Sequence, residues 1–163
     1  THNELEFVEF VPLNDVNAFN LENPLKGLQN NGSIFIQTQK TNQKEIWDAI
    51  PEWAQKIIQD KQINVYGLDT VNIAKDVSSQ ADLIQRMQGI VLLGIFLKVT
   101  PFFKQSKISK AKLMESVKNS LNKYFGKRGS RVVQDNLNAV KRGFNEVFQV
   151  NKIKQEKNIK KLA

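Results

Sequence analysis

The sequence predicts an α/β fold with a parallel sheet and several C-terminal helices. Residues 1–69 alternate short apolar runs with helical patterns, and strands separated by helices favour a parallel sheet. From Thr70 onward, the apolar residues recur at helical spacing. Only three strands are predicted, and none of them leads into a Gly-rich phosphate loop. We therefore expect the chain to be a fragment that lacks the first strand–turn–helix of its fold.

Three runs of residues are predicted to be strands. The first, LEFVEFVPL, is expected to stop at Pro12, which has no amide donor for a sheet. The second, SIFIQT after Gly32, is a β-branched and aromatic run, typical of a strand covered on both faces. The third strand is expected at Ile63–Asp69. Between the first two, NPLKGLQNNG has turn signals at both ends and is expected to form a short helix.

A helix interrupted by proline is predicted between the second and third strands. Thr41 or Asn42 is expected to cap it, and Glu45, three residues after Asn42, completes a capping-box pattern. The apolar stripe of this helix comprises Ile46, Ile50, Trp53, Ile57 and Ile58. Because Pro51 falls inside the pattern, the helix is expected to break near Ile50 and to restart from Pro51.

Residues 70–150 are predicted to be helical. The expected segments are a short turn at residues 70–77, a long helix at Gln80–Lys98, and two helices at Ser109–Phe125 and Ser130–Val150. Ser79, with Asp82 three residues later, is expected to cap the long helix, and Pro101 is expected to end it. Gly89 and Gly94 lower its helix propensity, but they allow another backbone to approach closely.

The last two helices are joined by the sequence GKRG, which is rich in cations. Gly126 is expected to end the first helix in the left-handed conformation, and Ser130 is expected to cap the second. Lys127, Arg128 and Arg131 surround this turn. Two interpretations stay open. The turn is a helix–helix corner with solvated cations, each of which contributes little, or it contacts an anion such as a phosphate.

The charge of the chain is distributed unevenly. The net charge is +8, and residues 104–163 carry 16 Lys or Arg but 4 acidic residues. Residues 1–103 carry 8 basic and 12 acidic residues. This polarity suggests a polyanionic ligand or an acidic neighbouring surface. The alternative is that Lys-rich, solvated helix faces keep the protein soluble.

The residue types exclude several kinds of catalytic site. The chain has no cysteine, and therefore no thiolate-ligated iron–sulfur cluster and no cysteine nucleophile. The single histidine, His2, leaves no histidine triad and no multi-histidine metal site. Asp69, at the end of a predicted strand, is more often a helix cap than a ligand-binding residue. No catalytic and no metal-binding residue is predicted.

The sequence shows no targeting segment. The longest apolar run, Met87–Val99, is shorter than a membrane span and is expected to be a core helix. The N-terminal residues THNELEFVEF lack the basic region of a secretory signal. A cytoplasmic protein without membrane contact is expected.

The order of motifs resembles the γ-type domain of the pyruvate:ferredoxin (flavodoxin) oxidoreductases. The resemblance covers Pro24–Val150. The matching motifs fall on Leu25–Gly32, Ile50 with Pro51, Tyr66–Asp69, Ala74 with Lys75, Met87 with Gln88, and Tyr124–Val140. No single motif is decisive, but their order and spacing together are specific. The resemblance implies a Rossmann-like fold of the swivelling-domain type over residues 1–150, with residues 151–163 as a charged linker or tail.

The resemblance also implies a function. Enzymes of this family decarboxylate a 2-oxoacid oxidatively on thiamine diphosphate with magnesium, pass electrons through iron–sulfur clusters to ferredoxin or flavodoxin, and release an acyl-CoA. The γ-type domain holds none of these cofactors; it packs on other domains or subunits and helps to place CoA. Lys127, Arg128 and Arg131 are then expected to contact a CoA phosphate or a neighbouring domain. A homo-oligomeric parent enzyme is expected.

Some residues depart from the family pattern. Before the Met-Gln helix, pyruvate enzymes usually have an Arg-Ile-Asn turn, whereas Asp82 and Ile84 occupy the Arg and Asn positions in this chain. This puts the CoA role, or the identity of the 2-oxoacid, in doubt. The alternative function is a stand-alone basic module that binds nucleic acid or an acidic protein. It would use Lys123, Lys127, Arg128, Arg131, Lys141 and Arg142, although no recognised nucleic-acid motif is present.

Overall fold

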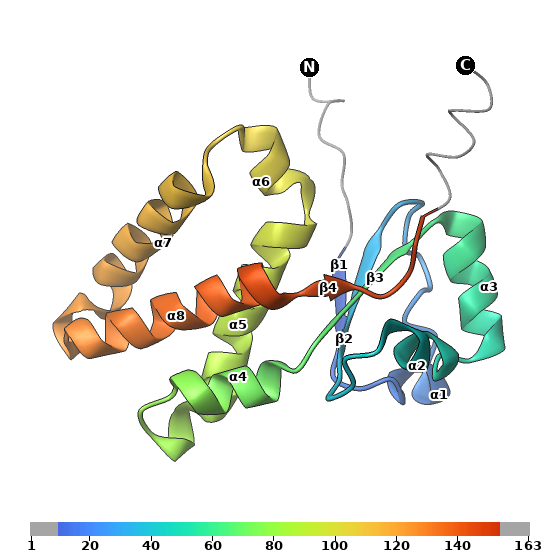
Figure 1. Cartoon of the computed structure of the whole chain (residues 1–163), viewed down its shortest axis with the longest axis horizontal. Coiled ribbons are helices and arrows are strands. Elements are labelled where there is room, and N and C mark those ends of the chain that lie inside the picture. The colour runs from blue at the N-terminus through green and yellow to red at the C-terminus, as the bar shows by residue number, and fades with distance from the viewer. Residues whose placement is uncertain (1–9, 154–163) are drawn as a thin grey trace. The chain divides into compact units, whose positions relative to one another are not determined.

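The computed structural model of the chain describes residues 10–153, which divide into two compact units (Figure 1). One unit contains residues 10–68 and 148–153 and carries the sheet, and the other contains residues 69–147 and is helical. The N-terminal part of the first predicted strand, His2 and residues 154–163 lie outside the described residues. No helix in the described part is long and apolar enough to cross a membrane.

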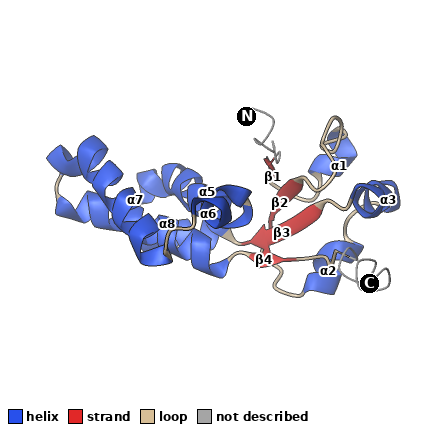
Figure 2. Cartoon of the chain, turned by 90° about the horizontal axis from the view of Figure 1, so that it is seen from above, coloured by secondary structure: helices blue, strands red, loops and turns tan. Residues whose placement is uncertain are grey.

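Within residues 10–153, the sheet has four strands in the order β1-β2-β3-β4, drawn in red in Figure 2. β1 (Phe10–Leu13), β2 (Ser33–Gln37) and β3 (Asn64–Leu68) are parallel, which confirms the predicted parallel sheet and the α/β class. Ile34 of β2 pairs with Val11 of β1 and with Val65 of β3. β4 (Phe148–Gln149) is antiparallel to β3 and was not predicted, because two residues are too short to show a strand pattern.

Pro12 does not end the first strand, contrary to the prediction. It lies inside β1 and pairs in register with Phe35 of β2. β1 is the edge strand of the described sheet, so a residue without an amide donor is tolerated there.

An apolar core stabilises the sheet unit, and many of its residues belong to the predicted strands and to the predicted apolar stripe of the helix. Ser33, Ile34, Phe35 and Ile36 are all buried, which confirms that β2 is covered on both faces. The core also contains Ile46, Ile50, Ala54, Ile58, Ile63 and Val65. Trp53 is the exception in the predicted stripe, because it is 43% exposed and Ala54 takes the buried position.

The two helices that follow β2 begin where the Asn42 cap and Pro51 predict. Asn42 caps α2 (Gln43–Asp48), since its side chain accepts a 3.1 Å hydrogen bond from the amide of Glu45. The helix breaks at Ile50, and α3 (Glu52–Lys61) begins directly after Pro51, as predicted.

The segment before β2 differs from the prediction. Residues 24–27 form a turn rather than a short helix, and Gly27 adopts a positive φ of 79°. A one-turn helix, α1 (Ala18–Leu21), lies earlier in the chain and was not predicted. Phe19 of α1 is buried and meets Trp53 edge-on, with ring centroids 6.1 Å apart.

The second unit consists of helices. Its elements are α4 (Thr70–Val77), η2 (Ala81–Leu83), α5 (Ile84–Val99), α6 (Pro101–Ser106), α7 (Lys110–Phe125), η3 (Gly126–Arg128) and α8 (Ser130–Glu146). The prediction was wrong at the start of the long helix, because η2 precedes it and Ser79 does not cap it. Pro101 ends α5 as predicted but also begins α6, which was not predicted. α8 ends at Glu146, before the predicted Val150.

α5 and α8 cross at two glycines. A Cβ added to Gly94 would overlap the main-chain carbonyl of Val140, and a Cβ added to Gly143 would overlap that of Val91. The predicted close approach at Gly94 is therefore confirmed. At Gly89 it was wrong, because no other atom lies within 4 Å of a Cβ placed there.

Candidate functional site

The basic turn between α7 and α8 is a short 3-10 turn. Gly126 is not left-handed, as had been expected, but right-handed helical (φ −57°, ψ −32°), so η3 continues from α7. The positive φ falls three residues later, on Gly129 (φ 107°). Ser130 is the first residue of α8 and does not cap it through its side chain. Neither the left-handed Gly126 nor the Ser130 cap that the sequence predicts is present.

The three predicted site residues lie in η3 and in the first turn of α8. Lys127, Arg128 and Arg131 are all exposed. Arg128 lines a cavity, and its guanidinium carbon lies 5.9 Å from the centroid of the Phe125 ring. Lys127 and Arg131 do not line this cavity.

The cavity beside Arg128 has a volume of about 60 Å³, and its lining is more apolar than polar. Its polar wall residues are Ser78, Ser79, Arg86, Arg128, Asp135 and Asn136. They come from the segment after α4, from α5, from η3 and from α8. The helical packing of residues 69–147 thus brings together side chains that are far apart in the sequence.

Arg86 is the cation that the sequence reasoning missed. Its guanidinium carbon lies 4.8 Å from the centroid of the same Phe125 ring, so Phe125 attracts both arginines through its π-system. Neither arginine forms an ion pair within residues 10–153. In the sequence, Arg86 is a charged residue that flanks an apolar run. That it lines the same cavity as Arg128 depends on the helix packing.

Two buried polar atoms in the wall of this cavity, Asn136 Oδ1 and Ser78 Oγ, lack a hydrogen-bond partner among the described residues. The Asn136 amide nitrogen donates a 2.8 Å hydrogen bond to the Val132 carbonyl, which leaves Oδ1 as a free acceptor. Oδ1 is buried without a hydrogen-bond partner, and Asn136 is only 4% exposed. The Ser78 hydroxyl is also buried and unpartnered. Buried polar atoms are nearly always hydrogen-bonded, so these two atoms need partners that residues 10–153 do not supply.

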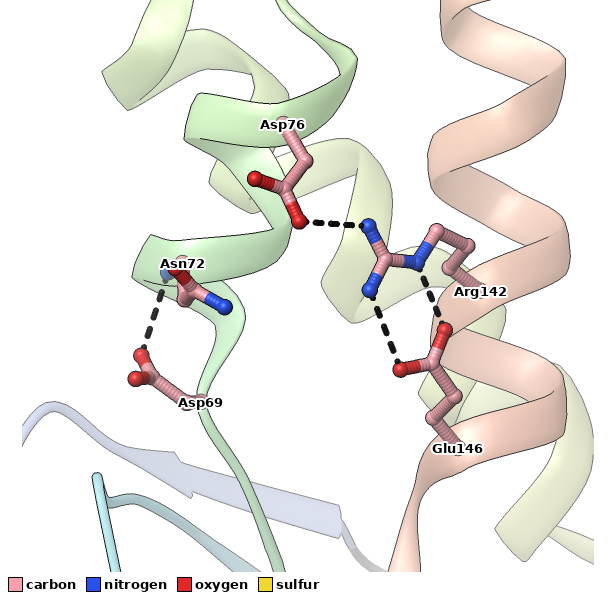
Figure 3. A network of polar contacts seen from close by, with 5 residues as sticks. All are labelled: Asp69, Asn72, Asp76, Arg142 and Glu146. Atoms are coloured by element: carbon pink, nitrogen blue, oxygen red, sulfur yellow. Dashed lines mark hydrogen bonds and ion pairs between the residues drawn. The ribbon is translucent and has the colours of Figure 1, made fainter.

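Arg142, which the nucleic-acid alternative counted as a free cation, is engaged instead (Figure 3). Its guanidinium donates to Asp76 at 3.0 Å and to both carboxylate oxygens of Glu146 at 2.6 and 3.2 Å. The Glu146 hydrogen bond, with that of Asp76, raises the pKa of Arg142. Asp69 in the same view caps α4 by accepting from the Asn72 amide, which confirms its expected capping role.

A second, larger cavity of about 350 Å³ lies in the sheet unit, after the carboxyl ends of β1 and β2. Its wall includes Asp15, Thr38 and Lys40. Asp15 accepts from the Asn17 amide, and the Thr38 hydroxyl accepts from the Lys40 amide. These side chains therefore complete local turns. Among the described residues, no group of three or more His, Cys, Asp or Glu side chains could hold a metal ion.

The chain is similar to known oxidoreductases in sequence. The family model for pyruvate ferredoxin/flavodoxin oxidoreductase matches residues 4–146. A pyruvate-flavodoxin oxidoreductase of Trichormus variabilis is 26% identical over 109 residues, which cover 67% of this chain and 8% of the relative. A relative from Synechocystis sp. is 28% identical over 119 residues, or 73% of this chain and 9% of that protein. The chain thus spans less than a tenth of these curated relatives.

A solved structure agrees with the fold. The pyruvate oxidoreductase subunit PORC of Thermotoga maritima superposes with a TM-score of 0.56 at 18% sequence identity. The match covers 87% of this chain and 65% of that subunit. At 18% identity, this structural similarity supports the fold alone. The family model covers most of the chain, and it confirms the family that the motifs predict. The chain belongs to the pyruvate ferredoxin/flavodoxin oxidoreductase family.

Proposed function

We propose that the chain is the γ-type domain of a thiamine diphosphate-dependent 2-oxoacid:ferredoxin (flavodoxin) oxidoreductase. The parent enzyme would convert pyruvate or a related 2-oxoacid to an acyl-CoA in the cytoplasm. Within it, the domain packs on the catalytic domains or subunits and contributes no catalytic residue. The match of the family model to residues 4–146 carries this proposal. Ferredoxin or flavodoxin and further copies of the enzyme are the proposed partners of the parent.

The cofactors of such an enzyme do not fit the residues of this chain. Iron–sulfur clusters are held by cysteine thiolates, and the sequence contains no cysteine. Magnesium bound to a diphosphate is held by phosphate oxygens, waters and one or two carboxylates. Among residues 10–153, no group of three or more His, Cys, Asp or Glu side chains could hold a metal ion. No step of the decarboxylation is therefore assigned to this chain.

We expect the isolated chain to bind no thiamine diphosphate. Titration of the chain with thiamine diphosphate and magnesium in a calorimeter should give only heats of dilution. Binding with a micromolar dissociation constant would show that the chain carries a cofactor site of its own.

CoA is the ligand of the parent enzyme that the basic turn fits. Lys127, Arg128 and Arg131 are exposed cations close together in the chain, and none of them forms an ion pair within the described residues. A guanidinium binds a phosphate through two parallel hydrogen bonds, and an ammonium binds it as a point charge. We propose that these side chains hold a CoA phosphate when the domain is part of the enzyme.

Replacing Lys127 and Arg128 together by alanine in the intact enzyme tests this role. We expect the Michaelis constant for CoA to rise about tenfold, which corresponds to about 1.4 kcal/mol of lost binding, with an unchanged melting temperature. The matched control is Lys112→Ala with Lys118→Ala, which removes the same charge from exposed positions of α7. An unchanged Michaelis constant would leave the turn as a structural corner with solvated cations.

The alternative of a nucleic-acid-binding module loses one of its cations, because Arg142 is bound by Asp76 and Glu146. Binding to the phosphate backbone weakens steeply as salt increases. Salt-dependent retention of the chain on a DNA or RNA column at physiological salt would favour this alternative over the oxidoreductase domain.

A further inference from the structure

We infer that the cavity lined by Arg86, Arg128, Ser78 and Asn136 is a binding site for free hydrogen phosphate. The wall of this cavity contains hydrogen-bond donors, on the two arginines, and an acceptor without a partner, Oδ1 of Asn136. A ligand that satisfies both must carry acceptor oxygens and at least one O–H group. The inference concerns the chain by itself and does not depend on a role in CoA binding.

The donors are the two arginines beside Phe125. Arg86 and Arg128 lie over the same ring at 4.8 and 5.9 Å and have no acidic partner among the described residues. The fork of N–H groups on a guanidinium matches the oxygen pair of a phosphate. Asp135 is the one acid in the wall, so the lining carries one net positive charge and favours an anion.

The acceptor that lacks a partner is Oδ1 of Asn136. The amide nitrogen of Asn136 is already used on the Val132 carbonyl, so the orientation of the side chain is fixed and Oδ1 can only accept. The Ser78 hydroxyl can donate or accept. A fully deprotonated oxyanion would satisfy the arginines and leave Oδ1 unpaired beside it. A hydrogen phosphate ion satisfies both, because it retains one P–OH group.

The size of the cavity agrees with this ligand. A cavity needs about 10–15 Å³ of this volume to hold one water, so about 60 Å³ accommodates a group of about four to six non-hydrogen atoms. A nucleotide or another large ligand would not fit within it.

Protonation distinguishes hydrogen phosphate from similar anions. Sulfate carries no proton at neutral pH. A phosphate monoester loses its second proton at a pKa of about 6, so at about pH 8 it is a dianion without an O–H group. At that pH, free phosphate is the one of these three oxyanions that can still donate a hydrogen bond.

The test is calorimetric titration of the chain at about pH 8 and constant ionic strength with sodium phosphate, sodium sulfate and methyl phosphate. We expect saturable binding of phosphate, with sulfate and methyl phosphate at least tenfold weaker. At about pH 5.5, where the monoester regains its proton, methyl phosphate should approach the affinity of phosphate. Equal affinities for phosphate and sulfate at pH 8 would overturn the selection by protonation, and absence of phosphate binding would overturn the site.

Two variants assign the binding to this cavity. Arg86→Gln should lower the affinity for phosphate at least tenfold, whereas Lys118→Gln, which removes the same charge from an exposed position on α7, should leave it unchanged. Arg128→Gln serves as the second cavity variant if Arg86→Gln alters the melting temperature. Equal losses in the cavity and control variants would mean binding by overall charge, and would overturn the assignment. Because Arg86 is outside the set proposed for CoA, this result is separate from the CoA experiment.

Discussion

The Gly94→Ala variant is expected to be less stable than the parent chain by about 3 kcal/mol, a large effect for one methyl group. The added Cβ would overlap the carbonyl of Val140, which belongs to the backbone of α8 and cannot rotate away as a side chain could. α5 and α8 would have to separate, and their packing against each other would be lost along both helices. Thermal unfolding measures the effect, which should lower the melting temperature by about 6–12 °C.

Gly89→Ala is the matched control on the same helix. No atom lies within 4 Å of a Cβ at Gly89, and alanine favours a helix over glycine by about 0.5–1 kcal/mol. This variant should therefore be slightly more stable than the parent chain. If both variants had the same stability, the helix crossing would not depend on Gly94.

Gly143 offers a second check of the same crossing. A Cβ at Gly143 would overlap the carbonyl of Val91, so Gly143→Ala should destabilise the unit to a similar extent. Once one substitution has separated α5 from α8, fewer contacts between these helices remain for the second substitution to break. The double variant Gly94→Ala with Gly143→Ala should thus lose less stability than the two single variants together.

Features set by short-range chemistry could be predicted from the sequence. Asn42 and Asp69 cap their helices through side chains that reach only three residues along the chain. Pro51 breaks and restarts a helix because its ring fixes the local backbone. The buried strand β2 could be predicted because its β-branched run has no polar face.

Features that depend on tertiary contacts could not be predicted. β4 is a strand only because the edge of β3 pairs with it, and its two residues have no pattern of their own. Gly126 and Gly129 can both adopt a positive φ, and the spacing of the glycines does not say that Gly129, before the first residue of α8, is the one that does.

The candidate site illustrates the same limit. Lys127, Arg128 and Arg131 were selected because they are adjacent in the sequence, yet the cavity combines Arg128 with Arg86, which lies on another helix. Asn136 is a polar residue of α8, and it is buried. The sequence does not show that Oδ1 of Asn136 lacks a hydrogen-bond partner, because this depends on which atoms of the neighbouring helices pack against it.

Asn151 is expected to be the most sensitive polar residue of the sheet unit. Its side chain continues the pairing of β4 with β3: Oδ1 accepts from the Val65 amide at 2.8 Å, and Nδ2 donates to the Ile63 carbonyl at 2.8 Å. Ile63 and Val65 are both fully buried, so solvent cannot replace these bonds. The Val65 carbonyl is held separately by the Val150 amide at 2.7 Å and is unaffected by a change at Asn151.

Replacing Asn151 by alanine should lower the free energy of unfolding by about 2–4 kcal/mol. It leaves a buried donor and a buried acceptor unpaired, and each costs about 1–3 kcal/mol. Amide hydrogen exchange gives a specific readout, because the Val65 amide should exchange much faster while the Asn64 amide, bonded to the Gly32 carbonyl, stays protected. The control is Gln149→Ala. It removes the single hydrogen bond that the partly exposed Gln149 side chain donates to Asn64. The free energy of unfolding should change by less than about 1 kcal/mol. A Val65 amide that stays as protected as in the parent chain would show that Asn151 does not hold the edge of β3.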